Sequence, residues 1–302
     1  MGKLAFVFPG QGAQVCGMGQ DFYENSETAK AVFDRATELL GFSVPELCFE
    51  KNDRLDITEY TQAAMVTTSV AMMKVMEERG IHADVAAGLS LGEYCALAAA
   101  GVMSEEDAIT TVRQRGIFMQ EEVPAGVGGM AAIMGLESTE IEKAIADIPQ
   151  VQVANYNCPG QIVITGWKED VEQAADALKE AGAKRVLPLN VSGPFHSYLL
   201  EEAGEKLGRF LENIPVSEPK IPYVANVTAA YVTKAEDVKP LLTRQVSSSV
   251  RWQQSVETML ADGVDRFIEI GPGKTLAGFI RKINREATVI NIEKFEDLEK
   301  LN

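Results

Sequence analysis

A serine between two glycines is the residue of this chain best suited to nucleophilic chemistry. Residues 88–92 read Gly-Leu-Ser-Leu-Gly, after an apolar run that predicts a buried strand and before an alanine-rich stretch that predicts a helix. Between a strand and a helix, G-x-S-x-G forces a sharp turn that exposes the serine hydroxyl where the helix N-terminus favours negative charge. We therefore expect Ser90 to be a nucleophile. The alternative is an ordinary strand-to-helix turn in which the serine caps the helix.

Only two histidines are available as a base for this serine. His82 precedes the expected strand at 84–87, which would carry it away from Ser90, and we interpret it as a residue without a catalytic role. His196 lies in a segment rich in turn formers, between an expected strand and an expected helix. Loops carry catalytic groups more often than their share of residues, so His196 is predicted to be the general base and later the general acid.

The segments around these residues alternate between buried strands and amphipathic helices. Strands are expected at 3–8, 84–87, 221–225 and 266–270, and helices at 21–40, 61–78, 104–120, 198–213, 236–246, 252–262 and 275–285. Ser104 is expected to cap the third of these helices. This alternation predicts a mostly parallel sheet with helices on both faces.

The middle of the chain follows a different order. Strands are expected at 130–134, 151–156, 161–165 and 185–189, with helices at 139–147 and across the apolar stripe from 171 to 181. This β-α-β-β-α-β order is typical of a ferredoxin-like arrangement. We therefore expect an α/β protein in which residues 1–124 and 197–302 form the core and residues 125–196 form an inserted ferredoxin-like subdomain.

Composition and charge exclude several classes of function. The chain has 302 residues, 46% of them hydrophobic, which is enough to bury a large core. Its four cysteines are scattered without a C-x-x-C pair, which argues against a zinc site and favours a reducing compartment. The net charge of −16 disfavours nucleic-acid binding. No apolar segment approaches ~20 residues, so we expect a cytoplasmic protein that does not span a membrane.

Six separated motifs together resemble the malonyl-CoA:acyl carrier protein transacylase family. They stand in order at 8–14 (FPGQGAQ), 88–92 (GLSLG), 114–116 (QRG), 155–161 (NYNCPGQ), 193–197 (GPFHS) and 269–273 (EIGPG). The resemblance spans essentially the whole chain and implies an α/β-hydrolase-like core with a ferredoxin-like subdomain. It also implies a monomeric enzyme of fatty acid synthesis that moves a malonyl group from malonyl-CoA to the phosphopantetheine thiol of holo acyl carrier protein. No metal or other cofactor is implied.

The resemblance carries three roles in the reaction to residues of this sequence. Ser90 matches the nucleophile, which becomes a malonyl-serine, and His196 matches its base. Arg115 matches the arginine that holds the malonyl carboxylate. A guanidinium can meet that carboxylate with two parallel hydrogen bonds, whereas an unpaired carboxylate is costly to bury. From the residues alone, Arg115 could equally be a charge on a helix surface, since Arg113 stands two positions away.

Main-chain groups complete the site that the resemblance implies. Gln11 and Leu91 match positions whose backbone N–H groups form an oxyanion hole. Gln245 matches a glutamine whose main-chain carbonyl orients the histidine, with Gln253 and Gln254 close enough to leave a shifted register open. We also expect Asn155, Asn157 and Gln161 near the wall of the cleft.

One departure from the family pattern stands beside the nucleophile, where Leu89 occupies a position that is often histidine. We interpret it as a change in selectivity or rate. Phe195, before the catalytic histidine, is similar to malonyl-selective members. Three alternatives stay open: a discrete acyltransferase of a polyketide synthase, a serine esterase or thioesterase with an aspartate in its triad, and a catalytically silent scaffold.

Overall fold

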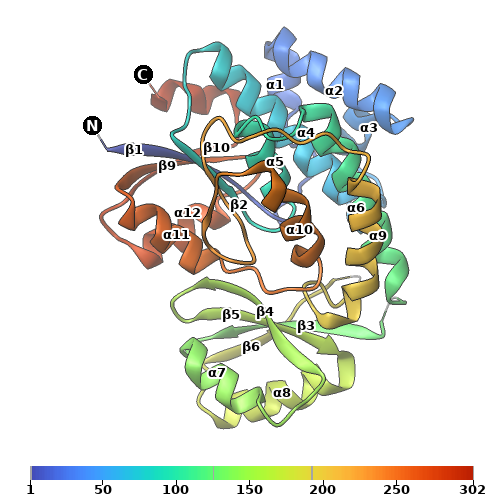
Figure 1. The fold of residues 1–302 in the computed structure, drawn as a ribbon, viewed down its shortest axis with the longest axis vertical. Helices are drawn as coiled ribbons and strands as arrows, with labels where there is room; N and C mark the ends of the chain where they lie inside the picture. Colours follow the sequence, from blue (N-terminus) through green and yellow to red (C-terminus); the bar gives the residue numbers. More distant parts are fainter. Residues whose placement is uncertain (1, 125, 192, 302) are drawn as a thin grey trace.

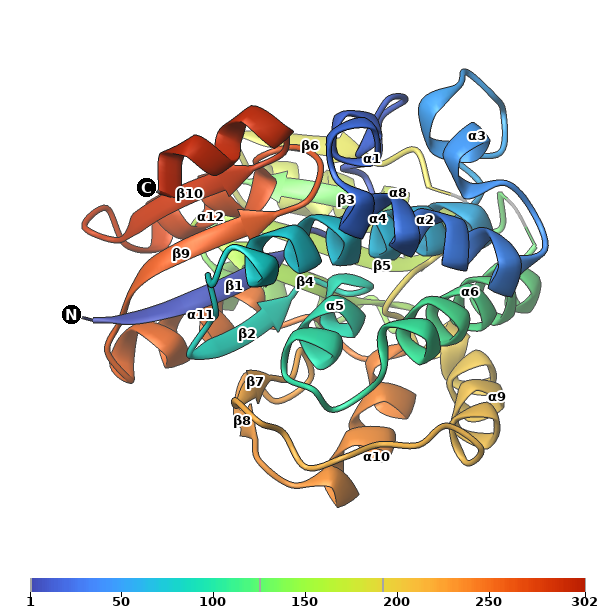
Figure 2. The same cartoon turned by 90° about the horizontal axis from the view of Figure 1, so that it is seen from above.

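The computed structural model describes residues 2–124, 126–191 and 193–301, which form two sheets of different kinds (Figures 1 and 2). The larger sheet has the strand order β10-β9-β1-β2-β7-β8. Neighbouring strands are parallel except β7 and β8, which confirms the predicted mostly parallel sheet. Its strands are β1 (Lys3–Phe8), β2 (Val85–Gly88), β7 (Tyr223–Val224), β8 (Tyr231–Val232), β9 (Val264–Ile270) and β10 (Thr288–Ile292).

Helices cover both faces of this sheet, so the central strands β1 and β2 are buried on both sides, and residues 5–8 and 85–88 are uninterrupted apolar runs. Side chains alternate along β1: Ala5 and Val7 share a hydrophobic cluster with α11 and α12, whereas Phe6 and Phe8 share another with α4 and α5. The helices of the core are α1 (Gln20–Asn25), α2 (Glu27–Leu40), α3 (Val44–Phe49), α4 (Thr58–Glu78), α5 (Gly92–Ala99), α6 (Glu105–Glu122), α9 (Glu201–Leu211), α10 (Ala235–Gln245), α11 (Trp252–Ala261) and α12 (Thr275–Ile283), with 3-10 helices η1 (Tyr198–Leu200) and η2 (Phe295–Leu301).

The smaller sheet has the order β4-β5-β3-β6, and all of its neighbours are antiparallel. Its elements are β3 (Gly128–Met134), α7 (Ser138–Ile145), β4 (Val151–Cys158), β5 (Gln161–Trp167), α8 (Lys168–Glu180) and β6 (Arg185–Pro188). The two helices pack on the face turned away from the core (Figure 1). Met130, Ala132 and Val163 on the opposite face join the main core cluster. The predicted ferredoxin-like order is confirmed.

The predicted limits of the inserted part, residues 125–196, fall in connections between elements. The first lies between α6 and β3, and the second lies between β6 and η1. Ala125 and Ser192 lie outside the described residues, so these limits stay a prediction.

Backbone hydrogen bonds join the smaller sheet to the core. The N–H of Tyr156 in β4 donates to the Val250 carbonyl over 2.9 Å, and the N–H of Val250 donates to the Ala154 carbonyl over 2.8 Å. Asn155 and Val250 thereby form an isolated parallel bridge. The two sheets are therefore linked by main-chain contacts as well as by the covalent chain.

The prediction of a single helix over 21–40 was wrong, because a serine divides it. Ser26 has extended backbone angles (φ −144°, ψ 121°), and its side chain accepts a hydrogen bond from the N–H of Ala29. Ser26 therefore ends α1 and caps α2. The predicted cap of α6 is confirmed, since the Ser104 hydroxyl accepts from the N–H of Asp107 over 3.0 Å. The sequence reading missed the short elements α3, β8, β10 and η2.

The turn from β2 to α5 depends on two glycines at points of close backbone approach. A Cβ on Gly88 would lie 2.0 Å from the carbonyl carbon and oxygen of Gly92. A Cβ on Gly92 would lie 2.3 Å from the carbonyl oxygen of Phe8, at the end of β1. The end of β2 is paired with β1 through Gly88 and Phe8, so the turn is packed directly against the sheet. Only glycine fits at either position.

We expect Gly88→Ala to lower the free energy of unfolding by about 3 kcal/mol, because the added methyl overlaps backbone atoms that cannot move aside. Gly278→Ala is the matched control, since a Cβ there meets nothing within 4 Å in α12. The control should stabilise the fold by about 0.5–1 kcal/mol. Urea unfolding measures both values, and equal effects from the two variants would contradict the packing argument.

Candidate active site

Ser90 lies at the turn between β2 and α5 with a left-handed backbone (φ 56°), which is uncommon for a residue other than glycine. The side chain of Asn226 holds this turn with two hydrogen bonds. Its Oδ1 accepts from the N–H of Ser90 over 2.7 Å, and its Nδ2 donates to the carbonyl of Gly88 over 2.6 Å. Such a conformation costs on the order of 1–3 kcal/mol and persists only when its surroundings fix it. The two hydrogen bonds of Asn226 therefore fix the strained turn that carries the predicted nucleophile.

His196 also has a left-handed backbone (φ 57°), and its ring contacts the side chain of Ser90. Its Nε2 lies 2.7 Å from Ser90 Oγ, and its Nδ1 lies 2.9 Å from the main-chain carbonyl of Gln245. Because a carbonyl can only accept, Nδ1 carries the proton and the neutral ring has Nε2 free to accept from the serine. Gln152 of β4 fixes the backbone here by donating to the His196 carbonyl over 3.0 Å.

The glutamine whose main-chain carbonyl contacts His196 is Gln245, so the register is not shifted to Gln253 or Gln254. The side chain of Gln253 instead donates to Glu257. His82 is exposed in the connection that leads into β2, at the end of that strand away from Ser90. The structure therefore brings His196 and Gln245 to the serine and leaves His82 apart from it.

Arg115 is a buried cation with neutral partners. It is 1% exposed, and its guanidinium donates to Gln62 Oε1 over 2.7 Å, Gln245 Oε1 over 3.1 Å and Ser90 Oγ over 3.2 Å. Within the described residues no carboxylate lies at ion-pair distance from it, and its Nε–H has no acceptor. Burial lowers the pKa of Arg115. A guanidinium held in this way has the capacity to bind an anion beside the serine.

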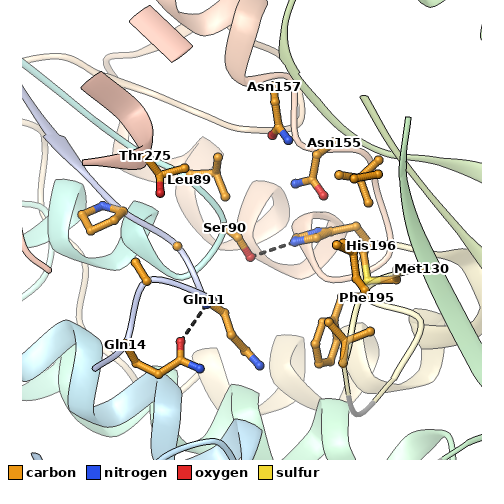
Figure 3. Close-up of a pocket in the computed structure, with 18 of the residues that line it drawn as sticks. Gln11, Gln14, Leu89, Ser90, Met130, Asn155, Asn157, Phe195, His196 and Thr275 are labelled. Atoms are coloured by element: carbon orange, nitrogen blue, oxygen red, sulfur yellow. Dashed lines mark hydrogen bonds between the residues drawn. The ribbon is translucent and has the colours of Figure 1, made fainter. Parts of the chain in front are cut away.

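Gln11 and Leu91 are the residues whose backbone N–H groups are predicted to form an oxyanion hole. Gln11 follows β1 and lines the same cavity as Ser90 (Figure 3), and Leu91 directly follows the serine as the N-cap residue of α5. In the part of the chain that the structure describes, no protein acceptor receives the backbone N–H of either residue. Two free N–H groups next to a nucleophile can stabilise an oxyanion.

A cavity of about 600 Å³ opens in front of these residues, between the core and the smaller sheet. Its walls combine apolar side chains from both parts with polar ones from β4, which Figure 3 shows, and from β5. They include Leu89, Met130, Ala132, Val163, Phe195, Asn155, Asn157 and Gln161. Asn155 and Asn157 are 8% and 7% exposed, and in the described structure neither side-chain amide has a hydrogen-bond partner. Both amides point into the cavity (Figure 3) and are available to a polar ligand.

Leu89 stands where the family pattern often has histidine. Its side chain lines the cavity, and its backbone runs so close to Gly10 that a Cβ there would lie 2.8 Å from the Leu89 carbonyl oxygen. The leucine also packs against the hydrophobic cluster that contains α11 and α12. The position therefore supplies an apolar wall next to the nucleophile.

Three residues of the site escaped the sequence analysis: Asn226, Gln62 and Glu93. Asn226 is 136 positions from Ser90, and no local pattern connects the two. Gln62 belongs to α4, where it is buried in a helix that also buries several threonines and a serine, so its polar type alone was a weak signal. Glu93 gave a similar signal, as an acid inside the apolar start of α5.

Among the described residues, no group of three or more His, Cys, Asp or Glu side chains is arranged to hold a metal ion. In the same part of the chain, no helix is both long and apolar enough to cross a membrane.

A serine on a strand–turn–helix elbow, with a histidine in hydrogen-bond contact, is typical of enzymes that form covalent ester intermediates. A model of the acyl transferase domain family matches residues 5–295. The chain therefore belongs to the acyl transferase family, as the motifs predicted.

Relatives within this family are similar along the whole chain. The malonyl CoA-acyl carrier protein transacylase of Bacillus subtilis is 46% identical over 304 residues, which cover 99% of this chain and 96% of that protein. An acyl carrier protein S-malonyltransferase from Vibrio cholerae matches with a TM-score of 0.97 and 42% identity, over 99% and 100% of the two chains. A malonyl-transacylase in complex with a holo type II PKS acyl-carrier protein matches with a TM-score of 0.96 and 40% identity, over 99% and 98%.

The pH dependence of serine reactivity follows from the position of His196. Burial, followed by the nearby charge of Arg115, lowers the pKa of His196 to about 4. The ring therefore stays neutral well below its ordinary titration range near 6.5. We expect the rate at which a sulfonyl fluoride modifies Ser90 to be flat from pH 8 to about pH 5 and half-maximal near pH 4. Peptide mass spectrometry at a series of pH values measures this rate.

An acid limb centred near pH 6.5 would contradict this assignment, and Ser90→Ala is the control for labelling elsewhere. The same shift affects stability. Between pH 6.5 and 4 the unfolded chain protonates this histidine and the folded chain does not, so His196 lowers stability as pH falls through that window.

Proposed function

We propose that this chain transfers a malonyl group from malonyl-CoA to the phosphopantetheine thiol of holo acyl carrier protein, through a malonyl ester on Ser90. The observation that carries the proposal is the uncompensated guanidinium of Arg115, 3.2 Å from Ser90 Oγ. A malonyl group on that oxygen ends in a carboxylate close to its point of attachment. Two parallel hydrogen bonds from the guanidinium would satisfy it.

The proposed cycle is ping-pong. His196 Nε2 takes the proton of Ser90 while the serine oxygen attacks the malonyl thioester carbonyl. The tetrahedral oxyanion accepts hydrogen bonds from the backbone N–H groups of Gln11 and Leu91. Each such donor stabilises the transition state by on the order of 3–4 kcal/mol in comparable sites. His196 then returns the proton to the departing thiolate of coenzyme A. The carrier protein thiol attacks the malonyl-serine by the same steps in reverse, which regenerates Ser90.

The cavity supports a long, partly polar thioester arm. Coenzyme A and holo acyl carrier protein share a phosphopantetheine arm whose amides need hydrogen-bond partners when they are buried. The unpaired amides of Asn155 and Asn157 can supply these, while the apolar walls cover the thioester and the methylene of the malonyl group. The same cavity would therefore serve both halves of the cycle.

The arrangement around His196 favours transfer over the hydrolase alternative. In the described structure its Nδ1 bonds to a main-chain carbonyl, and no aspartate takes the place of a triad acid. A plain esterase has no use for a buried cation at Arg115. The proposed cycle needs no metal or organic cofactor, since Ser90 and His196 carry the covalent and proton-transfer steps. The proposed site residues all belong to this chain, so the proposed cycle needs no residue from a second copy.

We propose fatty acid synthesis as the pathway supplied, as the resemblance of the motifs implies. A second candidate, a discrete acyltransferase that serves a polyketide carrier protein, is favoured by the similarity to the transacylase bound to a type II PKS carrier. Both readings require the same chemistry at Ser90 and differ in the acceptor. Comparison of kcat/KM for fatty acid and polyketide carrier proteins distinguishes them.

We expect Ser90→Ala to abolish formation of the malonyl-enzyme, with a loss on the order of 10⁶-fold in turnover, because no other group replaces the nucleophile. Intact-protein and peptide mass spectrometry after brief mixing with malonyl-CoA measures the adduct. In the wild type it should lie on the Ser90 peptide and disappear when holo acyl carrier protein is added. An adduct on the variant, or rapid release of free malonate by the wild type, would contradict the proposal.

Arg115→Ala should lower kcat/KM for malonyl-CoA by about 10²–10³-fold, because the bound carboxylate loses its only cation. Acetyl-CoA has no carboxylate, so its slow transfer should be spared or improved. Arg113→Ala is the matched control, since Arg113 pairs with Glu59 over 2.5 Å and lies over Tyr60. Steady-state kinetics with both thioesters test this, and equal losses for the two would leave Arg115 a structural role only.

A further inference from the structure

A second buried ionisable side chain lies next to the proposed site and has no part in the cycle above. Glu93, in the first turn of α5, is 1% exposed. Its Oε2 accepts two hydrogen bonds, from Gln245 Nε2 over 2.7 Å and from the backbone N–H of Asn226 over 3.1 Å. Among the described residues, no basic side chain lies at ion-pair distance from this carboxylate. Burying a carboxylate is costly, so a sequence that retains one there calls for an explanation.

Both hydrogen-bond partners of Glu93 also contact the proposed reacting residues. The carbonyl of Gln245 accepts from His196 Nδ1, and its side-chain Nε2 also donates to the carbonyl of Ser90 over 3.0 Å. Gln245 Oε1 accepts from Arg115. Asn226 clamps the elbow by accepting from the N–H of Ser90. A single carboxylate oxygen therefore fixes the two residues that orient the base and hold the nucleophile's backbone.

We propose that Glu93 is a positioning residue for acyl transfer, which acts through Gln245 and Asn226 by hydrogen bonding. It does not touch His196 and is not a triad acid. Its role is to hold the side chain of Gln245 so that the main-chain carbonyl of that residue meets His196 Nδ1, and to hold Asn226 against the strained turn at Ser90. The kinetic part of this inference rests on the proposed function, whereas the geometric part does not.

The network predicts how three variants differ. In Glu93→Gln, the amide oxygen can accept both N–H groups, so the network survives without the charge. In Glu93→Ala, Gln245 Nε2 and the Asn226 N–H lose their acceptor. Glu93→Asp keeps the charge but withdraws the oxygen by one methylene, and it replaces the alanine variant if that one does not fold.

The first measurement is the rate of malonyl-enzyme formation by rapid mixing and quenching. Glu93→Ala should be slower by about 10²-fold, the loss expected when reacting groups are misplaced by about 1 Å. The KM for malonyl-CoA should change little, because the cavity wall and Arg115 remain. Glu93→Gln should react at close to the wild-type rate. A glutamine variant as slow as the alanine variant would show that the charge is required and would overturn the hydrogen-bond assignment.

The second measurement follows His196 itself and needs no substrate. The chain has two histidines, so ¹⁵N-histidine labelling gives a spectrum with one exposed reference, His82, and one site residue. We expect the Nδ1–H of His196 to give a downfield proton resonance in the wild type and in Glu93→Gln. In Glu93→Ala that resonance should shift or broaden by exchange, while the signals of His82 stay in place.

A matched control separates positioning from general loss of a buried acid. Glu269 is fully buried and accepts the backbone N–H groups of Leu276 and Ala277 at the start of α12, over 3.0 and 2.8 Å. Glu269→Ala should lower stability but leave the His196 resonance unchanged. Glu93→Ala with a wild-type rate and an unchanged resonance would overturn the proposal. A wild type that malonyl-CoA does not acylate would instead refute the proposed function, and the resonance would still test Glu93.

Discussion

The buried charge of Arg115 is the constraint on which the arrangement of the site depends. A guanidinium this deep in a protein is unfavourable unless its hydrogen bonds are satisfied. Here two neutral glutamines and a serine hydroxyl accept from its terminal nitrogens, while in the described structure its Nε–H has no acceptor. The helices α4 and α10 must therefore hold Gln62 and Gln245 within hydrogen-bond distance of the guanidinium. The partial compensation leaves the cation with capacity for one more anion. Burial and, after it, the charge of Arg115 lower the pKa of His196 and keep its ring neutral beside Ser90.

The nucleophile and its base are each held in a strained backbone, and each strain is stabilised from a different part of the chain. The turn at Ser90 is fixed by Asn226 within the core. The turn at His196 is fixed by Gln152, which comes from the smaller sheet. The hydrogen bond of 2.7 Å between the two side chains therefore joins two separately supported turns. Neither turn alone would place the reacting atoms, so the site is a property of both sheets together.

The sequence was sufficient for the parts of this arrangement that have a local signature. The apolar runs and G-x-S-x-G predicted the sheet and Ser90, and the scarcity of histidine predicted His196. Arg115 was different, because Arg113 looks equivalent in sequence and only the resemblance separated them. In the structure Arg115 is buried, whereas Arg113 is paired with a carboxylate. Contacts such as those of Asn226 join segments more than a hundred positions apart, and no propensity or spacing encodes them.

The main-chain bridge between β4 and Val250 bears on how this fold can change during evolution or in engineering. It ties the smaller sheet to the segment that follows Gln245, five residues from the carbonyl that orients the base. A ferredoxin-like unit is a common building block, and its chain ends suggest a module that is easily exchanged. Here an exchanged unit would have to reproduce the hydrogen bonds between β4 and Val250 as well as the two chain connections to the core. A change at the edge of β4 would therefore be transmitted to the segment that carries Gln245, so the smaller sheet and the core are coupled where the base is aligned.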